Sequence, residues 1–177
     1  YILDPRGQHL DRYATASLRF SPGSDVAMLN AMINVIISEG LYDSDYVAKH
    51  TEGFEALKER TAHTTPEAMS PICGISPEEL RTVARGYAKA KSAIIFWGMG
   101  VSQHTHGTDN SRCLISLALL TGNVGRAGTG LHPLRGQNNV QGASDAGLIP
   151  MFFPDYKPVD DAETRAKYED LWQTELD

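Results

Sequence analysis

The fold of this chain is decided by the stretch SAIIFWGMG at residues 92–100. From Ser92 to Trp97 the run is almost continuously apolar and rich in β-branched and aromatic side chains, which is typical of a strand covered on both faces by helices. Glycines on either side of Met99 end the run. The stretch therefore predicts a central strand of a parallel sheet, with a glycine-rich turn at its carboxyl end.

The segment before this strand carries a strong helix start. Ser76 is placed to cap the helix, Pro77 occupies the first helical position, and Glu79 closes a capping box. Ile75 and Leu80 have the spacing of a hydrophobic staple. The helix is expected to bury one stripe of side chains, namely Leu80, Val83, Ala84 and Tyr87.

Further elements are predicted on both sides of this helix and strand. Residues 1–3 form a short apolar strand, and Pro22-Gly23-Ser24-Asp25 opens a helix that runs to about Ile37 and stops before Gly40. Two short helices are expected, one capped by Ser44 and the other over residues 53–61. A later helix spans about 108–121, with Gly122 as a left-handed cap. This order predicts an α/β fold, a Rossmann-like parallel sheet flanked by helices.

Composition and charge exclude some classes of protein. The 177 residues are 41% hydrophobic and 21% charged, which suits one substantial core. The net charge of −6 argues against a nucleic-acid surface. No apolar run approaches the ~20 residues that a membrane span needs. Cys73 and Cys113 are too few for a disulfide framework or a metal site, so we expect both to be reduced and buried.

The richest candidate site is the stretch PLRGQNNVQG at residues 133–142. It contains one guanidinium, four side-chain amides and two glycines. Amides need hydrogen-bond partners wherever they are buried, and glycines allow close backbone approach. The stretch therefore predicts a cradle for a large polar ligand, in which Arg135 supplies a fixed positive charge. The alternative is that Arg135 forms an ordinary surface salt bridge.

Three other motifs each have a functional and a simpler structural interpretation. Gly23, Ser24 and Asp25 could bind an anion or accept guanine N–H donors at a helix start, or could be an ordinary N-cap. The stretch 98–103 follows a strand but lacks the third glycine of a dinucleotide fingerprint, so its glycines could serve only to turn the backbone. His104 and His106 suggest a metal, but no third ligand is evident.

Five motifs in order and spacing resemble a known family. They are DPR at 4–6, PGSD at 22–25, GMGVSQ at 98–103, LTGN at 120–123 and LRGQNNVQG at 134–142. Together they resemble the middle of the catalytic (alpha) subunit of formate dehydrogenases, in the molybdopterin oxidoreductase family. The resemblance runs from Tyr1 to about Pro158. It implies an α/β domain that binds molybdopterin guanine dinucleotide at 1–135, followed at 136–177 by a cofactor loop and a segment leading into an adjacent domain.

The resemblance also implies a cofactor and its contacts. In the family, a molybdenum or tungsten ion is held by two pterins, each joined through a diphosphate to guanosine. The residues implied at one guanosine end are Asp4, Pro5, Arg6, Gly23, Ser24 and Asp25. The residues implied along the pterin cofactor are Gly98, Met99 and Gln103. Arg135 matches the arginine that holds the formate carboxylate beside the metal, and Gly136, Gln137 and Asn138 complete the polar cradle.

The same resemblance sets what lies outside this chain. We expect the chain to be an internal piece of a longer polypeptide, because the metal-ligating cysteine or selenocysteine, its neighbouring histidine and the iron–sulfur cysteines have no match here; neither Cys73 nor Cys113 corresponds to them. The implied partners are formate, the rest of the alpha subunit and iron–sulfur or flavin electron-transfer subunits, in a cytoplasmic complex. This piece alone is expected to be inactive.

Two alternatives stay open. One is another molybdopterin oxidoreductase, such as a nitrate reductase-like enzyme, although the arginine of RGQNN separates the chain from that group. The other is a noncatalytic α/β domain that binds a nucleotide or pairs subunits.

Overall fold

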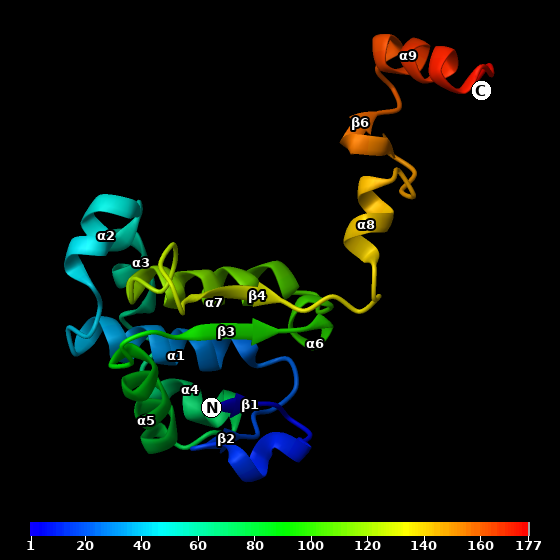
Figure 1. The fold of residues 1–177 in the computed structure, drawn as a ribbon. Helices are drawn as coiled ribbons and strands as arrows, with labels where there is room; N and C mark the ends of the chain where they lie inside the picture. Colours follow the sequence, from blue (N-terminus) through cyan, green and yellow to red (C-terminus); the bar gives the residue numbers. More distant parts are fainter. Residues whose placement is uncertain (177) are drawn as a thin grey trace. The chain divides into compact units, whose positions relative to one another are not determined.

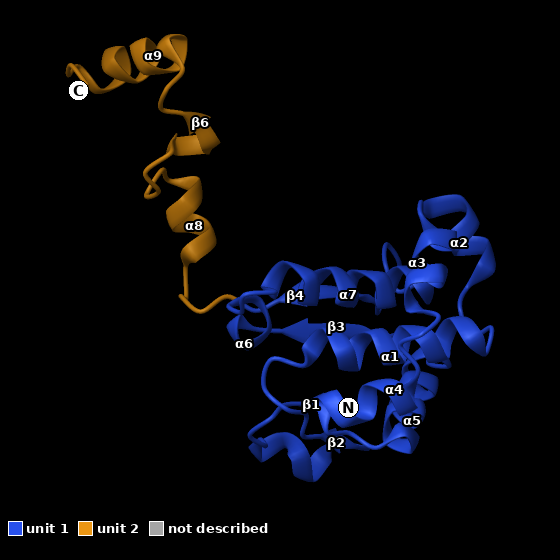
Figure 2. Ribbon diagram, turned by 180° about the vertical axis from the view of Figure 1, so that it is seen from behind, with its two compact units in different colours: residues 1–134 blue, residues 135–177 orange. Residues whose placement is uncertain are grey.

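The computed structural model describes residues 1–176, and the chain divides into two compact units, residues 1–134 and 135–177 (Figure 2). We describe each unit by itself. The assignment of the two parts to cofactor binding and to an adjacent domain stays a prediction.

Unit 1 combines short parallel strands with a larger set of helices (Figure 1). Its strands are β1 (Ile2–Leu3), β2 (Ser17–Leu18), β3 (Ile94–Trp97) and β4 (Gly130–Pro133). Its helices are the 3₁₀ turn η1 (His9–Tyr13), α1 (Asp25–Ser38), α2 (Ser44–His50), α3 (Phe54–Thr61), α4 (Pro66–Cys73), α5 (Pro77–Ala88), α6 (Met99–Ser102) and α7 (Gly107–Leu120).

The strands pair in parallel, which confirms the predicted fold class. β1 pairs with β2, and β3 pairs with β4 in the register Ile94↔Gly130 to Trp97↔Pro133. The four strands form two separate two-stranded sheets within the described residues. Neither β2 nor β4 was predicted, because β2 has only two residues and β4 reads GLHP, whose glycine and proline are depleted in strands.

The core of unit 1 surrounds α1. This helix packs against α3, α4, α5 and α7, so it is buried over most of its circumference. Ile33 and Ile36 of α1 are fully buried, as are Leu80 and Val83 of α5, which confirms the stripe expected on α5. The apolar spacing of α1 and α5 therefore predicted correctly which side of each helix is buried.

The ends of the helices show which local predictions were right. Ser76 accepts a hydrogen bond from the N–H of Glu79 and completes the capping box of α5, and Gly122 after α7 has a φ of +62°. Asp43, not Ser44, caps α2: its carboxylate accepts from the N–H of Tyr46 at 2.9 Å. The helix α4 was not predicted, because it contains Pro71 as well as an N-terminal proline.

The expectation that β3 is covered on both faces was wrong for the described residues. Ile95 and Trp97 pack against the core, but Ile94 is 43% exposed and Phe96 is 61% exposed. The core helices α1, α5 and α7 all lie on the inner face. On the outer face the ring of Phe96 stacks on His132, with ring centroids 5.2 Å apart.

Unit 2 is small and is held by an aromatic cluster. It contains α8 (Val140–Asp145), β5 (Phe152–Phe153), the 3₁₀ turn η2 (Pro154–Tyr156), β6 (Lys157–Pro158) and α9 (Ala162–Trp172). The rings of Phe153, Tyr168 and Trp172 contact one another, and the Tyr168 hydroxyl donates to the carbonyl of Pro154 at 2.8 Å. Among residues 1–176, no helix has the length and apolar character needed to cross a membrane.

Candidate cofactor-binding site

The first part of the site is the loop that leaves the carboxyl end of β1. One carboxylate oxygen of Asp4 accepts the N–H groups of Arg6 and Gly7 at 2.8 and 3.1 Å, and the other accepts the Gln8 side-chain amide at 2.7 Å. The Gln8 hydrogen bond is the main cause that lowers the pKa of Asp4, and the backbone donors add to it. Asp4 therefore holds a turn that leaves Pro5 and Arg6 exposed.

The second part is the start of α1. Gly23 has a φ of +83°, which a side chain would strain. Ser24 occupies the N-cap position but makes no side-chain capping bond, and its hydroxyl instead donates to the carbonyl of Ser21 at 2.6 Å. The interpretation of this motif as an ordinary N-cap was therefore wrong. The first N–H groups of α1 are left for another partner.

Asp25 is the unusual residue of this helix start. The residue is only 4% exposed, yet none of the residues 1–176 donates a hydrogen bond to its carboxylate. Asp25 also lines the cavity of unit 1, so its carboxylate is open to a ligand or to another part of the protein that supplies donors. The paired N1–H and N2–H donors of guanine have the matching chemistry.

The third part follows the carboxyl end of β3. Gly98 is extended, and α6 begins at once with Met99, which is 44% exposed. The Gln103 side-chain amide lies 3.5 Å from the Met99 sulfur, and Gln103 is exposed. A Cβ added at Gly98 or at Gly100 would meet nothing within 4 Å. These glycines therefore do not relieve an internal clash; they keep the surface beside β3 open.

Two residues that the sequence analysis missed hold α6 in place. A Cβ at Gly107 would overlap the carbonyl of Ser102, so only glycine lets α7 begin against the end of α6. Asn110 of α7 is 2% exposed and donates to the carbonyl of Val101 at 2.9 Å. An asparagine on the apolar face of a predicted helix was the signal that could have found this contact.

The three parts lie toward one end of unit 1. Leu3, Asp25 and Trp97 line the same cavity of about 400 Å³, and they lie directly before or within the motifs at 4–6, 23–25 and 98–103. Figure 1 shows the carboxyl ends of β1 and β3 and the start of α1 toward the same end. Ligands of parallel sheets bind beyond these ends, so the arrangement suits a binding site.

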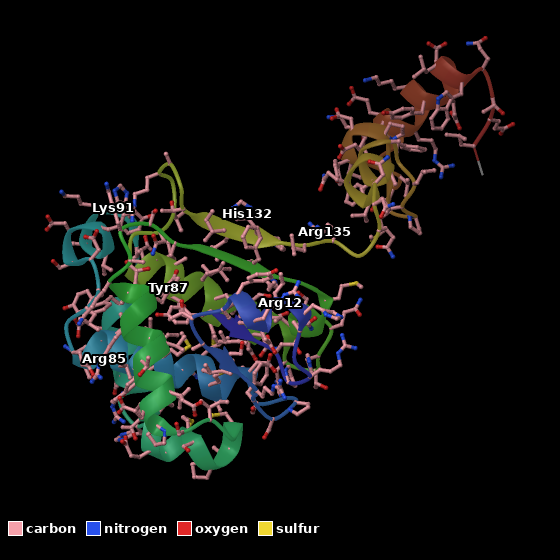
Figure 3. The ribbon with its side chains drawn as sticks, turned by 60° about the horizontal axis from the view of Figure 1, so that its bottom comes forward. Arg12, Arg85, Tyr87, Lys91, His132 and Arg135 are labelled. Carbon is pink, nitrogen blue, oxygen red and sulfur yellow. The ribbon has the colours of Figure 1, made fainter. Side chains whose placement is uncertain are left out.

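Arg135 (Figure 3) and the amide-rich loop belong to unit 2. The exposed residues of this stretch include Arg135, Gly136, Gln137 and Asn138. The N–H of Leu134 donates to the carbonyl of Trp97 at 2.7 Å, so Arg135 comes directly after the last hydrogen bond between β4 and β3. Within unit 2, the Gln141 amide donates to Asp145 and to the Tyr156 hydroxyl, both at 3.1 Å. The structure does not place this loop against the three parts in unit 1, so that grouping stays a prediction.

The described residues offer no metal centre of their own. Across residues 1–176, no three His, Cys, Asp or Glu side chains come together in a way that could hold a metal ion. His104 and His106 are exposed. Both cysteines are free and buried, and burial raises the pKa of the Cys113 thiol to about 11.

The chain belongs to the molybdopterin oxidoreductase family, which it matches over residues 1–169. Formate dehydrogenase H of Escherichia coli is 47% identical over 174 residues, covering 98% of this chain and 24% of the relative. The alpha subunit of an F420-dependent formate dehydrogenase of Methanocaldococcus jannaschii is 46% identical over 175 residues, covering 99% and 26%. A nitrate reductase of Synechocystis is 36% identical over 172 residues, covering 97% and 24%.

A solved structure is also similar to this chain. The chain resembles acetylene hydratase from Pelobacter acetylenicus with a TM-score of 0.69 and 31% identity, over 71% of this chain and 17% of that one. The chain spans about a quarter of the length of the curated relatives it matches. The names of the relatives cover more than one reaction, so the family alone does not determine the substrate.

Proposed function

We propose that the full-length protein is a formate dehydrogenase, in which this chain supplies part of a site for a molybdenum or tungsten bis-molybdopterin guanine dinucleotide. The observation that carries the proposal is Arg135, in the sequence RGQNN, directly after the last hydrogen bond from β4 to the carboxyl end of β3. A guanidinium there is well suited to grip a carboxylate through two parallel hydrogen bonds.

The residues present fit such a cofactor. Asp25 offers a carboxylate on the cavity lining to which none of the residues 1–176 donates, and this suits the N–H edge of guanine. The uncapped start of α1 offers N–H groups that favour a diphosphate. Gly98 and Gly100 leave open surface, along which Met99 and Gln103 could contact a flat pterin. Arg6 adds an exposed positive charge beside the same end of the unit.

In this proposal the chain's residues bind and orient the substrate. Formate is oxidised to carbon dioxide with release of one proton and two electrons, and the bound group supplies the two-electron acceptor. Arg135 holds the carboxylate and fixes the direction of the C–H bond. Gly136 permits close approach of the backbone, while Gln137 and Asn138 donate to the polar edge of the cofactor. Electrons leave through iron–sulfur clusters outside this chain, toward partner subunits in a cytoplasmic complex.

The test is formate-dependent reduction of a viologen dye by the full-length, metal-loaded protein and its Arg135→Ala and Arg135→Lys variants. Both variants should lose at least about 100-fold in kcat/KM for formate, because a lysine cannot reproduce the two-pronged grip. Arg112→Ala, an exposed arginine of α7, is the matched control and should retain activity. Unchanged formate turnover in Arg135→Ala would contradict the proposal.

The second candidate is a different reaction at the same cofactor. It is favoured by the nitrate reductase of Synechocystis, whose match covers nearly the whole chain. Loaded wild-type protein that reduces nitrate and does not oxidise formate would establish this candidate instead.

A further inference from the structure

Helix α8 follows directly after the loop at 135–139, so the far end of the loop that carries Arg135 is fixed to this helix (Figure 1). The N–H of Ala143 donates to the carbonyl of Asn139 at 2.9 Å, which joins Asn139 to the first turn of α8. A Cβ added at Gly142 would lie 2.5 Å from the Asn139 side-chain oxygen, so the Asn139 side chain lies closely over this turn. The loop therefore ends on a closely packed helix start.

Within unit 2, α8 packs against η2, and Tyr156 of η2 makes a polar contact with it. The Gln141 side-chain amide donates to the Tyr156 hydroxyl and to the Asp145 carboxylate, both at 3.1 Å. The bond to Asp145 stays within α8, whereas the bond to Tyr156 joins the helix to another segment. Just after α8, a Cβ added at Gly147 would lie 2.6 Å from the backbone nitrogen of Pro154, so only a glycine allows this close approach. The helix is therefore held near both of its ends by one neighbouring segment.

The backbone that presents Tyr156 is strained. Asp155 has a φ of +62° and Tyr156 has a φ of +53°, so two consecutive residues with side chains adopt the left-handed conformation. Strain of this kind persists only where surrounding contacts maintain it, and it is found most often at functional segments. The Tyr156 ring meets the edge of the Phe152 ring at a centroid distance of 5.9 Å. The contacts with Phe152 and Gln141 together fix both the ring and the hydroxyl of Tyr156.

We infer that Tyr156 is a positioning residue for substrate binding. Through Gln141, its hydroxyl holds α8, and with it the loop of Arg135, in the conformation that grips the formate carboxylate. This inference rests on the proposed function, since that function assigns Arg135 to formate. Tyr156 acts only through the loop and does not touch the substrate. A loop that already has its binding conformation before the substrate arrives loses less conformational entropy on binding.

Loss of the Tyr156 hydroxyl should therefore raise the KM for formate and leave kcat nearly unchanged. Without the contact, the loop adopts its binding conformation for a smaller fraction of the time, and the apparent affinity for formate falls with that fraction. Once formate is bound, Arg135 has the same geometry as in the wild type, so the chemical step keeps its rate. A purely structural role would instead reduce the amount of active enzyme, which lowers the apparent kcat and leaves KM unchanged.

The test is the kinetics of formate oxidation by the full-length, metal-loaded protein with Tyr156→Phe, Gln141→Ala and both changes together. Tyr156→Phe keeps the ring and should raise KM by about 3- to 10-fold, the usual effect of one hydrogen bond between uncharged groups. The double variant should have the KM of Gln141→Ala, because both changes remove the same contact. Tyr13→Phe, at a residue that is 74% exposed, is the matched control and should keep the wild-type KM. An unchanged KM in Tyr156→Phe, or effects that multiply in the double variant, would overturn the inference.

Hydrogen exchange of the full-length protein without formate gives a second readout that does not depend on turnover. The peptide that covers residues 140–148 should exchange about 3- to 10-fold faster in Tyr156→Phe than in the wild type, while Tyr13→Phe should match the wild type. Equal exchange in Tyr156→Phe and the wild type would also overturn the inference. Wild-type protein that does not oxidise formate would contradict the proposed function, whereas faster exchange in Tyr156→Phe would still show that Tyr156 holds α8.

Discussion

The side-chain oxygen of Asn123 accepts a hydrogen bond from the backbone N–H of Ala93 at 3.0 Å, and this contact ties the end of α7 to the start of β3. The same oxygen accepts from the Arg126 guanidinium at 3.1 Å, and the Asn123 amide donates to the Thr121 hydroxyl at 2.8 Å. Asn123 is 1% exposed. The LTGN motif at 120–123 therefore has a structural role: it sets where β3 begins, and hence where Gly98 ends it.

Replacing Asn123 by alanine should destabilise the protein by about 1–3 kcal/mol, because it leaves the half-buried Ala93 N–H without its acceptor and removes one of the three acceptors of the Arg126 guanidinium. Thermal unfolding of the purified full-length protein measures the change. Thr82→Ala, at an exposed position of α5, is the control and should be nearly neutral. Equal melting temperatures for the two variants would contradict the role of Asn123.

Replacing Gly107 by alanine should displace α6, because the new Cβ would overlap the Ser102 carbonyl. Overpacking of this kind costs about 1–3 kcal/mol. We expect lower pterin and metal content per protein in the full-length variant, since Met99 and Gln103 move with α6. Thr108→Ala, at the next and exposed position, is the matched control. Full cofactor content in Gly107→Ala would show that the position of α6 does not matter for binding.

The helices of unit 1 could be predicted because their start and stop signals are local. Ser76, Pro77 and Glu79 define the start of α5 within four residues, and Gly122 ends α7 by its own backbone preference. The helix α4 was missed since Pro71 breaks the pattern. β4 was missed because its pairing comes from its neighbour β3 and not from the strand propensity of GLHP.

The candidate site was only partly predictable, because some of its hydrogen bonds depend on the backbone conformation and not on local sequence signals. The motifs at 4–6, 23–25 and 98–103 could be placed at the ends of strands and a helix, and the structure brings them toward one end of unit 1. The sequence could not show that the Asp4 carboxylate accepts hydrogen bonds from its own loop. Nor could it show that the Ser24 side chain does not cap α1. Both depend on backbone conformation several residues away. The exposure of one face of β3 was not predicted. An apolar run indicates that a strand is covered, but it does not identify the segment that covers it.

Replacing Asp25 by asparagine should weaken cofactor retention about 10- to 100-fold, since an amide cannot accept two hydrogen bonds from guanine as a carboxylate does. The guanine nucleotide released from denatured full-length protein, per mole of chain, measures retention. Glu78→Gln, which removes an exposed carboxylate on α5, is the control. An unchanged nucleotide content in Asp25→Asn would remove Asp25 from the guanosine end.

The ion pair between Glu39 and Arg85 should make a small, pH-dependent contribution to stability. Two hydrogen bonds of 2.8 Å join the carboxylate and the guanidinium, from the end of α1 to α5. The hydrogen bonds from Arg85 lower the pKa of Glu39 below its ordinary value of 4.5, despite an opposing effect of burial. Because the folded pKa is the lower one, the stabilisation is fully present above pH 4.5 and is lost as the pH falls through the folded value.

Glu39→Gln should therefore lower the melting temperature by no more than about 2 °C at pH 7, and the difference from wild type should shrink as the pH falls below 4.5. Thermal unfolding between pH 3.5 and pH 7 measures this. Glu55→Gln is the control, because Glu55 is 82% exposed and lies 3.9 Å from Lys58, so its change at pH 7 should be smaller. A difference for Glu39→Gln that grows toward low pH would have the wrong sign for a carboxylate held ionised by Arg85.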